Sequence, residues 1–227
     1  MRLVKDNFYL FDAMMPANAP STHTAQLFDD AKSRSDALVG FVRQGLEDGD
    51  SVVVVAIREH WQQAATPLLR RGLQLDADIA SYRLRVYDAN EMLGRFTIEN
   101  RVDRMLFDQV VGERVRRLRS RARRLRIYGE MVDLLAGSGD FANALRLEEM
   151  WNDLLREELA DLFCGYSSIH FGDPRHSASL SQICRTHSCL RSSPHDKLGS
   201  HLLQPHIGSI DAPQRPPQPD AGTVHEA

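Results

Sequence analysis

The sequence predicts an α/β fold, a three-layer sandwich with a mostly parallel central sheet between two layers of helices. Short apolar segments alternate with longer amphipathic segments from about residue 24 to about residue 188. Such alternation is typical of a parallel sheet whose crossover helices cover both faces. The β-branched run at 51–57 supports this fold most directly, because a continuous apolar strand needs cover on both sides.

The first half of the predicted domain ends its helices at glycines. Ser33 or Ser35 can cap the first helix, which ends at Gly49, and the second helix ends before Gly72. The elements predicted in this half are strands at 24–28, 51–57 and 84–87 and helices at 33–49 and 59–71.

The second half contains a long helix whose apolar residues form one stripe. Leu106, Val110, Val115 and Leu118 recur at helical spacing within it, which predicts that this stripe packs on the sheet. The elements predicted in this half are helices at 103–121, 141–159 and 180–188 and strands at 125–128 and 162–166.

The predicted domain occupies 21–190 and is flanked by two segments of different composition. Residues 1–20 end in a turn-rich stretch with two prolines and are interpreted as an extension or linker. Six of the ten prolines lie in 191–227, among Ser, His and Gln, so this segment is predicted to be a disordered tail.

Composition excludes several classes of protein. A formal net charge of -3 gives no general argument for binding nucleic acid or membranes. No segment has the roughly 20 apolar residues of a membrane span, and the N-terminus does not resemble a signal peptide. The three cysteines are odd in number and lie late in the chain, which argues against a disulfide framework. We therefore expect a cytoplasmic protein.

Acidic residues stand where predicted strands end, which is where parallel sheets bind ligands. Asp29, Asp88 and Glu130 each lie at or just after such an end. On the helix at 141–159, Glu148 shares a face with Asn152. Together with His23, these residues are the predicted ligand-binding set. Two alternatives remain for Glu130: an acid–base or metal role with His23, Glu148 and Glu149, or structural pairing with an arginine or backbone amides.

The known catalytic and cofactor motifs are missing. The segment 29–36 has no glycine, which argues against a phosphate-binding P-loop, so Lys32 and Arg34 are interpreted as surface charges rather than as an anion site. A zinc site at Cys184, His187 and Cys189 would need a fourth ligand from His170 or His176 and is not predicted. Cys164 is interpreted as a core residue. No catalytic residue, metal or cofactor is predicted.

Eight arginines lie in 114–126. A basic helix face can bind phosphate groups, but aromatic residues for base stacking are absent from this segment. The run is therefore interpreted as a solvated helix face, and nucleic-acid binding is not predicted.

Several short segments resemble the MEDS domain, the sensory domain named for methanogens, methylotrophs and the dichloromethane repressor DcmR. The resemblance covers about 21–190 and rests on the order and spacing of its segments. They are THTAQLFDD at 22–30, GLEDGDSVVV at 45–54, YDANEML at 87–93, YGEM at 128–131, LEEMWN at 147–152 and CRTH at 184–187. Asp29 departs from the family pattern, which usually has Tyr after the Phe.

The resemblance implies a fold like that of RecA and the circadian-clock ATPases, without a functional Walker A loop. It also implies a non-enzymatic sensory role in bacterial signal transduction or transcription regulation. Family members are commonly attached to histidine kinases or DNA-binding domains, and neither is recognised in this chain. We therefore expect an unknown small-molecule ligand at the carboxyl edge of the sheet, a signalling partner of one of these two kinds, and a possible homodimer. The alternatives are a ligand-independent interaction module and a nucleotide-binding remnant.

Overall fold

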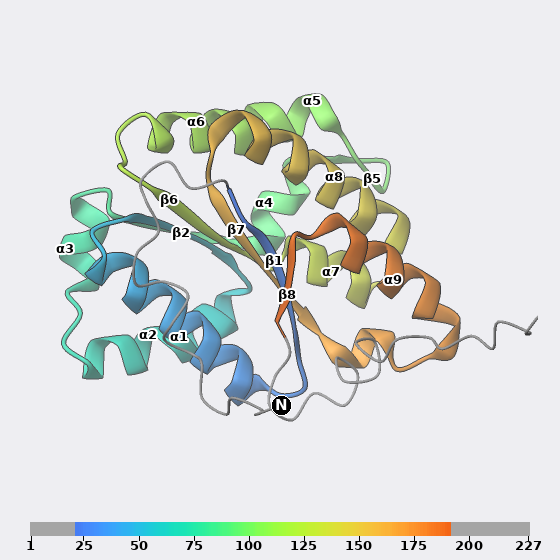
Figure 1. The fold of residues 1–227 in the computed structure, drawn as a ribbon, viewed down its shortest axis with the longest axis horizontal. Helices are drawn as coiled ribbons and strands as arrows, with labels where there is room; N and C mark the ends of the chain where they lie inside the picture. Colours follow the sequence, from blue (N-terminus) through green and yellow to red (C-terminus); the bar gives the residue numbers. More distant parts are fainter. Residues whose placement is uncertain (1–20, 192–227) are drawn as a thin grey trace, which may run out of the picture.

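A computed structural model describes residues 21–191, which form an α/β domain around one six-stranded sheet (Figure 1). All strand pairs in this sheet are parallel, and the strand order is β3-β2-β6-β7-β1-β8. The strands are β1 (His23–Phe28), β2 (Ser51–Ala56), β3 (Leu84–Asp88), β6 (Leu125–Gly129), β7 (Asp161–Ser167) and β8 (Cys189–Arg191). The predicted α/β class and parallel sheet are confirmed.

Helices cover both faces of the sheet and define two hydrophobic cores. One face packs against α1 (Ala31–Glu47), α2 (Arg58–Arg70) and α3 (Leu75–Ala80). The other face carries the remaining helices, which are α4 (Ala89–Gly94), α5 (Arg104–Phe107), α6 (Glu113–Arg119), α7 (Met131–Gly137), α8 (Phe141–Glu158) and α9 (Ser177–Thr186). A short hairpin, β4 (Thr97–Ile98) with β5 (Arg101–Val102), lies outside the main sheet.

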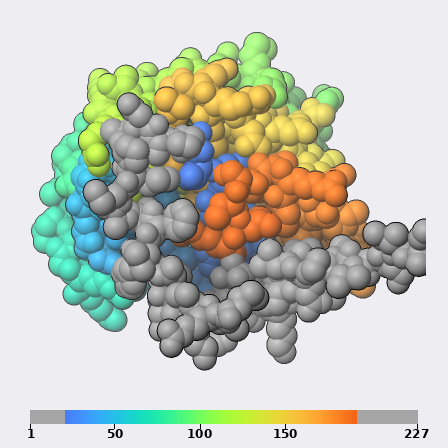
Figure 2. All heavy atoms as spheres, in the orientation of Figure 1, coloured from blue at the N-terminus to red at the C-terminus, as the bar shows by residue number. Residues whose placement is uncertain are grey.

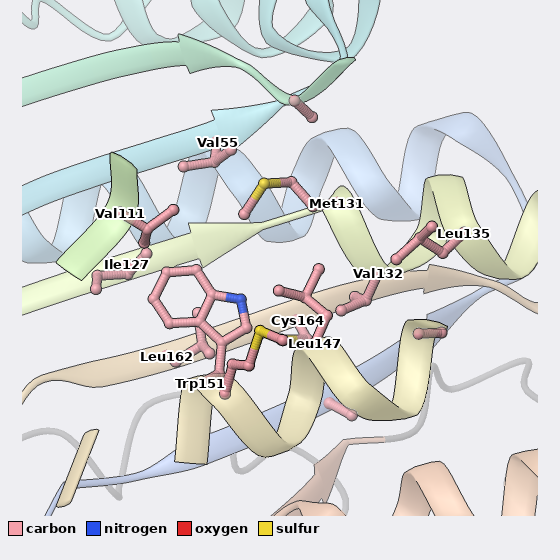
Figure 3. Packing of buried hydrophobic residues seen from close by; sticks show 14 of the residues in the cluster. Val55, Val111, Ile127, Met131, Val132, Leu135, Leu147, Trp151, Leu162 and Cys164 are labelled. Atoms are coloured by element: carbon pink, nitrogen blue, oxygen red, sulfur yellow. The ribbon is translucent and has the colours of Figure 1, made fainter. Parts of the chain in front are cut away.

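Side chains of each strand alternate between the two cores, and β7 shows this most clearly. Leu162, Cys164 and Tyr166 belong to the core beneath α8, whereas Phe163 belongs to the core beneath α1. Figure 3 shows Leu162 and Cys164 close to Leu147 and Trp151 of α8. Trp151 is 2% exposed, so its indole is a core group.

Three details of the predicted elements are corrected by the structure. The cap of α1 is Asp30 rather than Ser33 or Ser35, because its carboxylate accepts from the Ser33 amide at 2.7 Å. The helix predicted at 103–121 is interrupted by a π-helical turn, Asp108–Gly112. Helix α7 and strand β8 were not predicted, since neither exceeds seven residues and neither has a clear periodic pattern.

The predictions for the chain ends fall almost entirely outside the described residues. Residues 1–20 and 192–227 are not described, and Arg191, predicted to begin the tail, is the last residue of β8. None of the described helices is long and apolar enough to cross a membrane. The closer likeness to RecA and the loss of a Walker A loop stay predictions.

Candidate functional site

The structure divides the predicted ligand-binding residues between separate places. His23, Glu148 and Asn152 lie together between the sheet and helices α8 and α9. Glu130 follows β6 and Asp88 ends β3, so these two stand at the carboxyl edge of the sheet. Asp29 also lies at this edge but is exposed, and its carboxylate accepts a hydrogen bond from Ser168 Oγ at 2.7 Å. The expected single site at the carboxyl edge is therefore wrong for His23, which begins β1.

The first group, which we call the inner cluster, consists of His23, Glu148, Cys164, Tyr166 and His187. It draws on β1, α8, β7 and the residue after α9. His23 Nε2 lies 3.1 Å from Glu148 Oε2 and 3.4 Å from Cys164 Sγ, and His187 Nε2 lies 3.3 Å from Glu148 Oε1. The side chains of Glu148 and His187 are fully buried. Figure 2 shows α9 and β8 (orange) packed against α8 (yellow) on this side of the molecule.

Hydrogen bonds from outside the inner cluster fix its two imidazole rings. His23 Nδ1 lies 2.9 Å from Asn152 Oδ1, and the Asn152 amide nitrogen donates to Thr186 O at 2.8 Å. This second bond orients the amide so that its oxygen faces His23. His187 Nδ1 lies 2.7 Å from Ile183 O, which can only accept. Both Nδ1 atoms therefore carry hydrogen, and both Nε2 atoms point toward Glu148 as acceptors when the rings are neutral.

The charge of Glu148 shifts the proton affinities around it. Burial raises the pKa of this carboxyl, but His187 and His23 outweigh burial and hold the pKa well below its usual range. Burial lowers the pKa of His187, yet Glu148 raises it above the ordinary value. The pKa values of Cys164 and Tyr166 are raised by burial first and by Glu148 second. The Tyr166 hydroxyl donates to Glu148 Oε1 in a short hydrogen bond.

The second group, which we call the edge cluster, consists of Arg34, His60, Tyr128, Glu130 and Asp133. Glu130 is fully buried and accepts from the Ile57 amide at 2.8 Å and from Tyr128 Oη at 2.9 Å. His60 Nδ1 lies 2.9 Å from Glu130 Oε2, while His60 Nε2 lies 2.9 Å from Arg34 Nη1. The ring therefore donates to the acid and accepts from the arginine. Glu130 consequently holds the start of α2 against β6.

Arg34 brings positive charge to both acids of the edge cluster. Its guanidinium lies 3.5 Å from Asp133 Oδ2 and 4.0 Å from Glu130 Oε1, although Nε itself makes no hydrogen bond. His170 adds a contact of 3.1 Å to Asp133. The interpretation of Arg34 as a surface charge is wrong, because the residue is only 9% exposed, whereas Lys32 is exposed and pairs with Asp36. The structural reading of Glu130, pairing with an arginine and a backbone amide, matches this geometry.

Two glycines make room for these contacts. A Cβ at Gly165 would lie 2.7 Å from Tyr128 Oη and 3.0 Å from the Phe28 ring, so the absence of a side chain lets Tyr128 reach Glu130. A Cβ at Gly137 would lie 3.0 Å from the His170 ring, which needs that space to reach Asp133. Neither role can be read from the sequence, because both depend on packing between distant segments.

Asp88 lies in a pocket beside the edge cluster, at the carboxyl ends of β2 and β3. We call it the edge pocket; its volume is about 330 Å³. Trp61, Tyr87 and Met92 provide apolar surface, and Arg58 pairs with Asp88 at 3.4 Å. The complete lining is Ala56, Arg58, Trp61, Val86, Tyr87, Asp88, Glu91, Met92, Arg95 and Arg114. Of this lining only Asp88 was predicted from the sequence, since no motif links α2, α4 and Arg114 of α6.

The arginine run differs from its predicted role, and the late cysteines lie apart from His187's partners. Arg126 is buried and pairs with Asp48 and Asp50 at 2.7 Å each, and Arg124 pairs with Asp161 at 2.6 Å. The run is therefore partly an internal ion-pair network rather than a solvated helix face. Cys184 is half-buried and Cys189 is exposed, and His187 lies in the inner cluster with Cys164 instead.

The fold and its two buried polar clusters define a compact α/β domain with charged groups enclosed on both faces of its parallel sheet. The chain matches the family model described as MEDS, the methanogen/methylotroph, DcmR sensory domain, over residues 22–188, and it belongs to this family. The predicted family is confirmed. A comparison with curated proteins finds no match.

Proposed function

We propose that this chain is a signal-input domain that binds a small anionic ligand in the edge pocket and acts through a partner protein. Membership of a sensory-domain family supports the sensory role. The observation that carries the ligand site is the edge pocket itself, which combines aromatic walls with arginines at the carboxyl edge of the sheet.

The charge of the edge pocket favours an anion. Three arginines line it against two acids, and Arg58 is already paired with Asp88. Among the described residues, the Arg95 guanidinium has no hydrogen-bond or ion-pair partner, so it is free to meet a carboxylate or phosphate group. Trp61 and Tyr87 would cover the apolar part of the same ligand. The ligand class is thus a small molecule with an apolar body and one anionic group.

We propose binding without turnover. Neither Glu130 nor Glu148 lines the edge pocket, and its lining contains no histidine or cysteine. A bound ligand would instead contact α2, α4 and Arg114 of α6, and so connect α2, whose start is held by Glu130, to the other face of the sheet. Ligand binding changes partner contact only if two arrangements of these elements differ in affinity for the ligand. The partner we expect is a histidine kinase or a transcription regulator.

A thermal-shift screen of small carboxylates, organic phosphates, nucleotides and neutral analogues tests the proposal. A ligand at 100 times its dissociation constant should stabilise the domain by about 2.7 kcal/mol. Arg95→Ala should weaken binding of an anionic hit, and Trp61→Ala should weaken binding of its apolar part. Arg70→Ala, an exposed change at the far end of α2, is the matched control.

The outcomes of the screen distinguish the proposed ligand-binding function from its two alternatives. A hit that responds to Arg95→Ala and Trp61→Ala but not to Arg70→Ala supports the edge pocket. A nucleotide hit that is hydrolysed would instead favour the nucleotide-binding alternative. If a partner binds equally to the wild type and to both pocket variants, with no ligand found, the ligand-independent interaction module replaces the proposal.

A further inference from the structure

We propose that His23, Glu148, Cys164 and His187 of the inner cluster bind a divalent transition-metal ion, with zinc the best fit. One ligand atom from each of these residues lies within 4.8 Å of the others. Two imidazole nitrogens, a carboxylate oxygen and a thiol sulfur form a ligand set that zinc accepts. The site is separate from the edge pocket, since none of its residues lines that pocket.

Four distances in the inner cluster, measured to one or the other oxygen of Glu148, are close to the edge lengths of a zinc tetrahedron. Zinc bonds of about 2.0–2.1 Å to nitrogen or oxygen and about 2.3 Å to sulfur place ligand atoms about 3.3 Å apart, or about 3.5 Å where one is sulfur. The nitrogen-to-oxygen distances in the inner cluster are 3.1 and 3.3 Å. The distances from Cys164 Sγ are 3.4 Å to His23 and 3.7 Å to Glu148.

Both imidazoles are held with an acceptor nitrogen turned inward. Asn152 occupies Nδ1 of His23, and the Ile183 carbonyl occupies Nδ1 of His187, so each Nε2 carries a lone pair. Metal-binding histidines are usually fixed in this way by a partner on the other ring nitrogen. The Tyr166 hydroxyl does the same for the carboxylate of Glu148.

Protons alone do not satisfy the hydrogen-bonding groups of the inner cluster. His187 Nε2 is buried and has no hydrogen-bond partner, although Glu148 Oε1 lies only 3.3 Å away. In the neutral state, the lone pair of His187 Nε2 faces a buried carboxylate without a donor, which costs free energy, and His23 Nε2 has only the weak thiol donor of Cys164. One divalent cation at the centre would accept all of these lone pairs and neutralise Glu148 and a Cys164 thiolate together.

Four protein ligands make a closed site, which is typical of structural rather than catalytic zinc. The ligands come from β1, β7, α8 and the residue following α9. A bound ion would therefore join the C-terminal α9–β8 segment to the central sheet, and its loss would release that connection. The metal ion would therefore stabilise the packing of this segment on the face of the sheet opposite α1 and α2.

Cobalt substitution tests the site in the full chain. The protein is purified without an affinity tag, stripped with a chelator and titrated with Co²⁺. We expect binding at a ratio near unity, with the intense d–d bands of tetrahedral Co²⁺ and a thiolate-to-metal charge-transfer band. Zn²⁺ should displace Co²⁺ and remove both features.

Control variants assign the ligands without relying on the folding of any single mutant. In Cys184→Ser/Cys189→Ser the charge-transfer band should persist, and Cys164 is then the only remaining thiol. Replacing the tail histidines, His195, His201, His206 and His225, by Gln should also leave the spectrum unchanged. Cys164→Ser should remove the charge-transfer band, and His187→Gln should abolish the tetrahedral spectrum.

Asn152→Ala tests the positioning role of the amide, because loss of such a partner lowers metal affinity about 10- to 100-fold. The proposal fails if the wild type gives no tetrahedral Co²⁺ spectrum. It also fails if the charge-transfer band disappears in the Cys184→Ser/Cys189→Ser variant, or if binding is lost with the tail histidines.

Discussion

The edge cluster and the inner cluster both bury carboxylates, but they compensate that charge differently. Glu130 in the edge cluster accepts from an amide, a tyrosine and His60, and Arg34 supplies positive charge. In the inner cluster, two imidazoles, a thiol and the Tyr166 hydroxyl surround Glu148, and no arginine or lysine within 21–191 pairs with it. The edge cluster thus sets an arginine against its carboxylates, although Arg34 Nε has no hydrogen-bond partner, whereas the inner cluster has more electron-pair donors than cations.

The two clusters also join different parts of the fold. The edge cluster links α1, α2 and α7 to the end of β6, beside the edge pocket. The inner cluster links α8 and the end of α9 to β1 and β7. We conclude that internal ion pairs stabilise the carboxyl edge of the sheet, and we infer that a bound ion stabilises the packing of α8 and α9 on the sheet. The predictions below test this contrast.

The largest effect is expected from Glu130→Ala. Removing the carboxylate takes away one of the two acids beside Arg34 and leaves the Ile57 amide and Tyr128 hydroxyl without acceptors. Breaking a buried ion pair in this way costs about 3–5 kcal/mol. Urea unfolding should show this loss of stability equally with zinc and with chelator.

The exposed acid Glu149 provides the matched control, and Glu149→Ala should change the free energy of unfolding by less than about 0.5 kcal/mol. A loss below about 1 kcal/mol for Glu130→Ala would mean that the edge cluster is not a structural network.

A smaller loss of stability is expected from Gly165→Ala. This substitution tests one face of the sheet separately, because Gly165 and Cys164 are neighbours in β7 that face opposite sides. Its new methyl group would push against Tyr128 and Phe28 and disturb the edge cluster, while Cys164 points to the other face. Overpacking of this kind costs about 1–3 kcal/mol. Zinc affinity should be unchanged, as measured by competition with a chromogenic chelator. Equal losses of stability and zinc affinity would mean that the two faces are not independent.

The smallest effect is a pH dependence of the metal-free protein. Burial lowers the pKa of His187, but Glu148 outweighs it and raises the pKa above its ordinary 6.5. The folded state therefore holds this proton more tightly than the unfolded chain. That stability is fully present below pH 6.5 and is lost as the pH rises through the raised value.

Zinc should reverse the sign of this slope, because protons compete with the metal for the same imidazole and thiol. Urea unfolding in chelator and in zinc, across pH 6 to 8 (roughly the range in which imidazoles titrate), measures both slopes. His187→Gln should flatten the slope in chelator. If the slope in chelator is the same in His187→Gln as in the wild type, His187 is not the group that causes the pH dependence.

Most of the sheet could be predicted from the sequence, because β-branched runs and glycine stops are local signals. The strands at 24–28, 51–57, 84–87, 125–128 and 162–166 all lie within β1, β2, β3, β6 and β7 or differ by one residue at an end. Strand β8 could not be predicted, because its three residues are exposed and become a strand only by pairing with β1.

The site was predictable as a list of residues but not as an arrangement. Four of the six predicted residues, His23, Glu130, Glu148 and Asn152, lie in or contact the two clusters. Their division into two clusters depends on which face of the sheet each polar side chain lies on. The sequence does not specify that face for an isolated polar residue. His60 and Arg34 were missed or misread because nothing local distinguishes a buried cation from a surface one.

X-ray absorption at the zinc edge of the zinc-loaded wild-type protein tests the central claim most directly, since it reads the atoms bound to the metal. We predict one sulfur at about 2.3 Å and three nitrogen or oxygen atoms at about 2.0–2.1 Å, with imidazole scattering beyond them. A shell of nitrogen and oxygen alone, or a six-coordinate shell, would contradict a zinc ion held by His23, Glu148, Cys164 and His187.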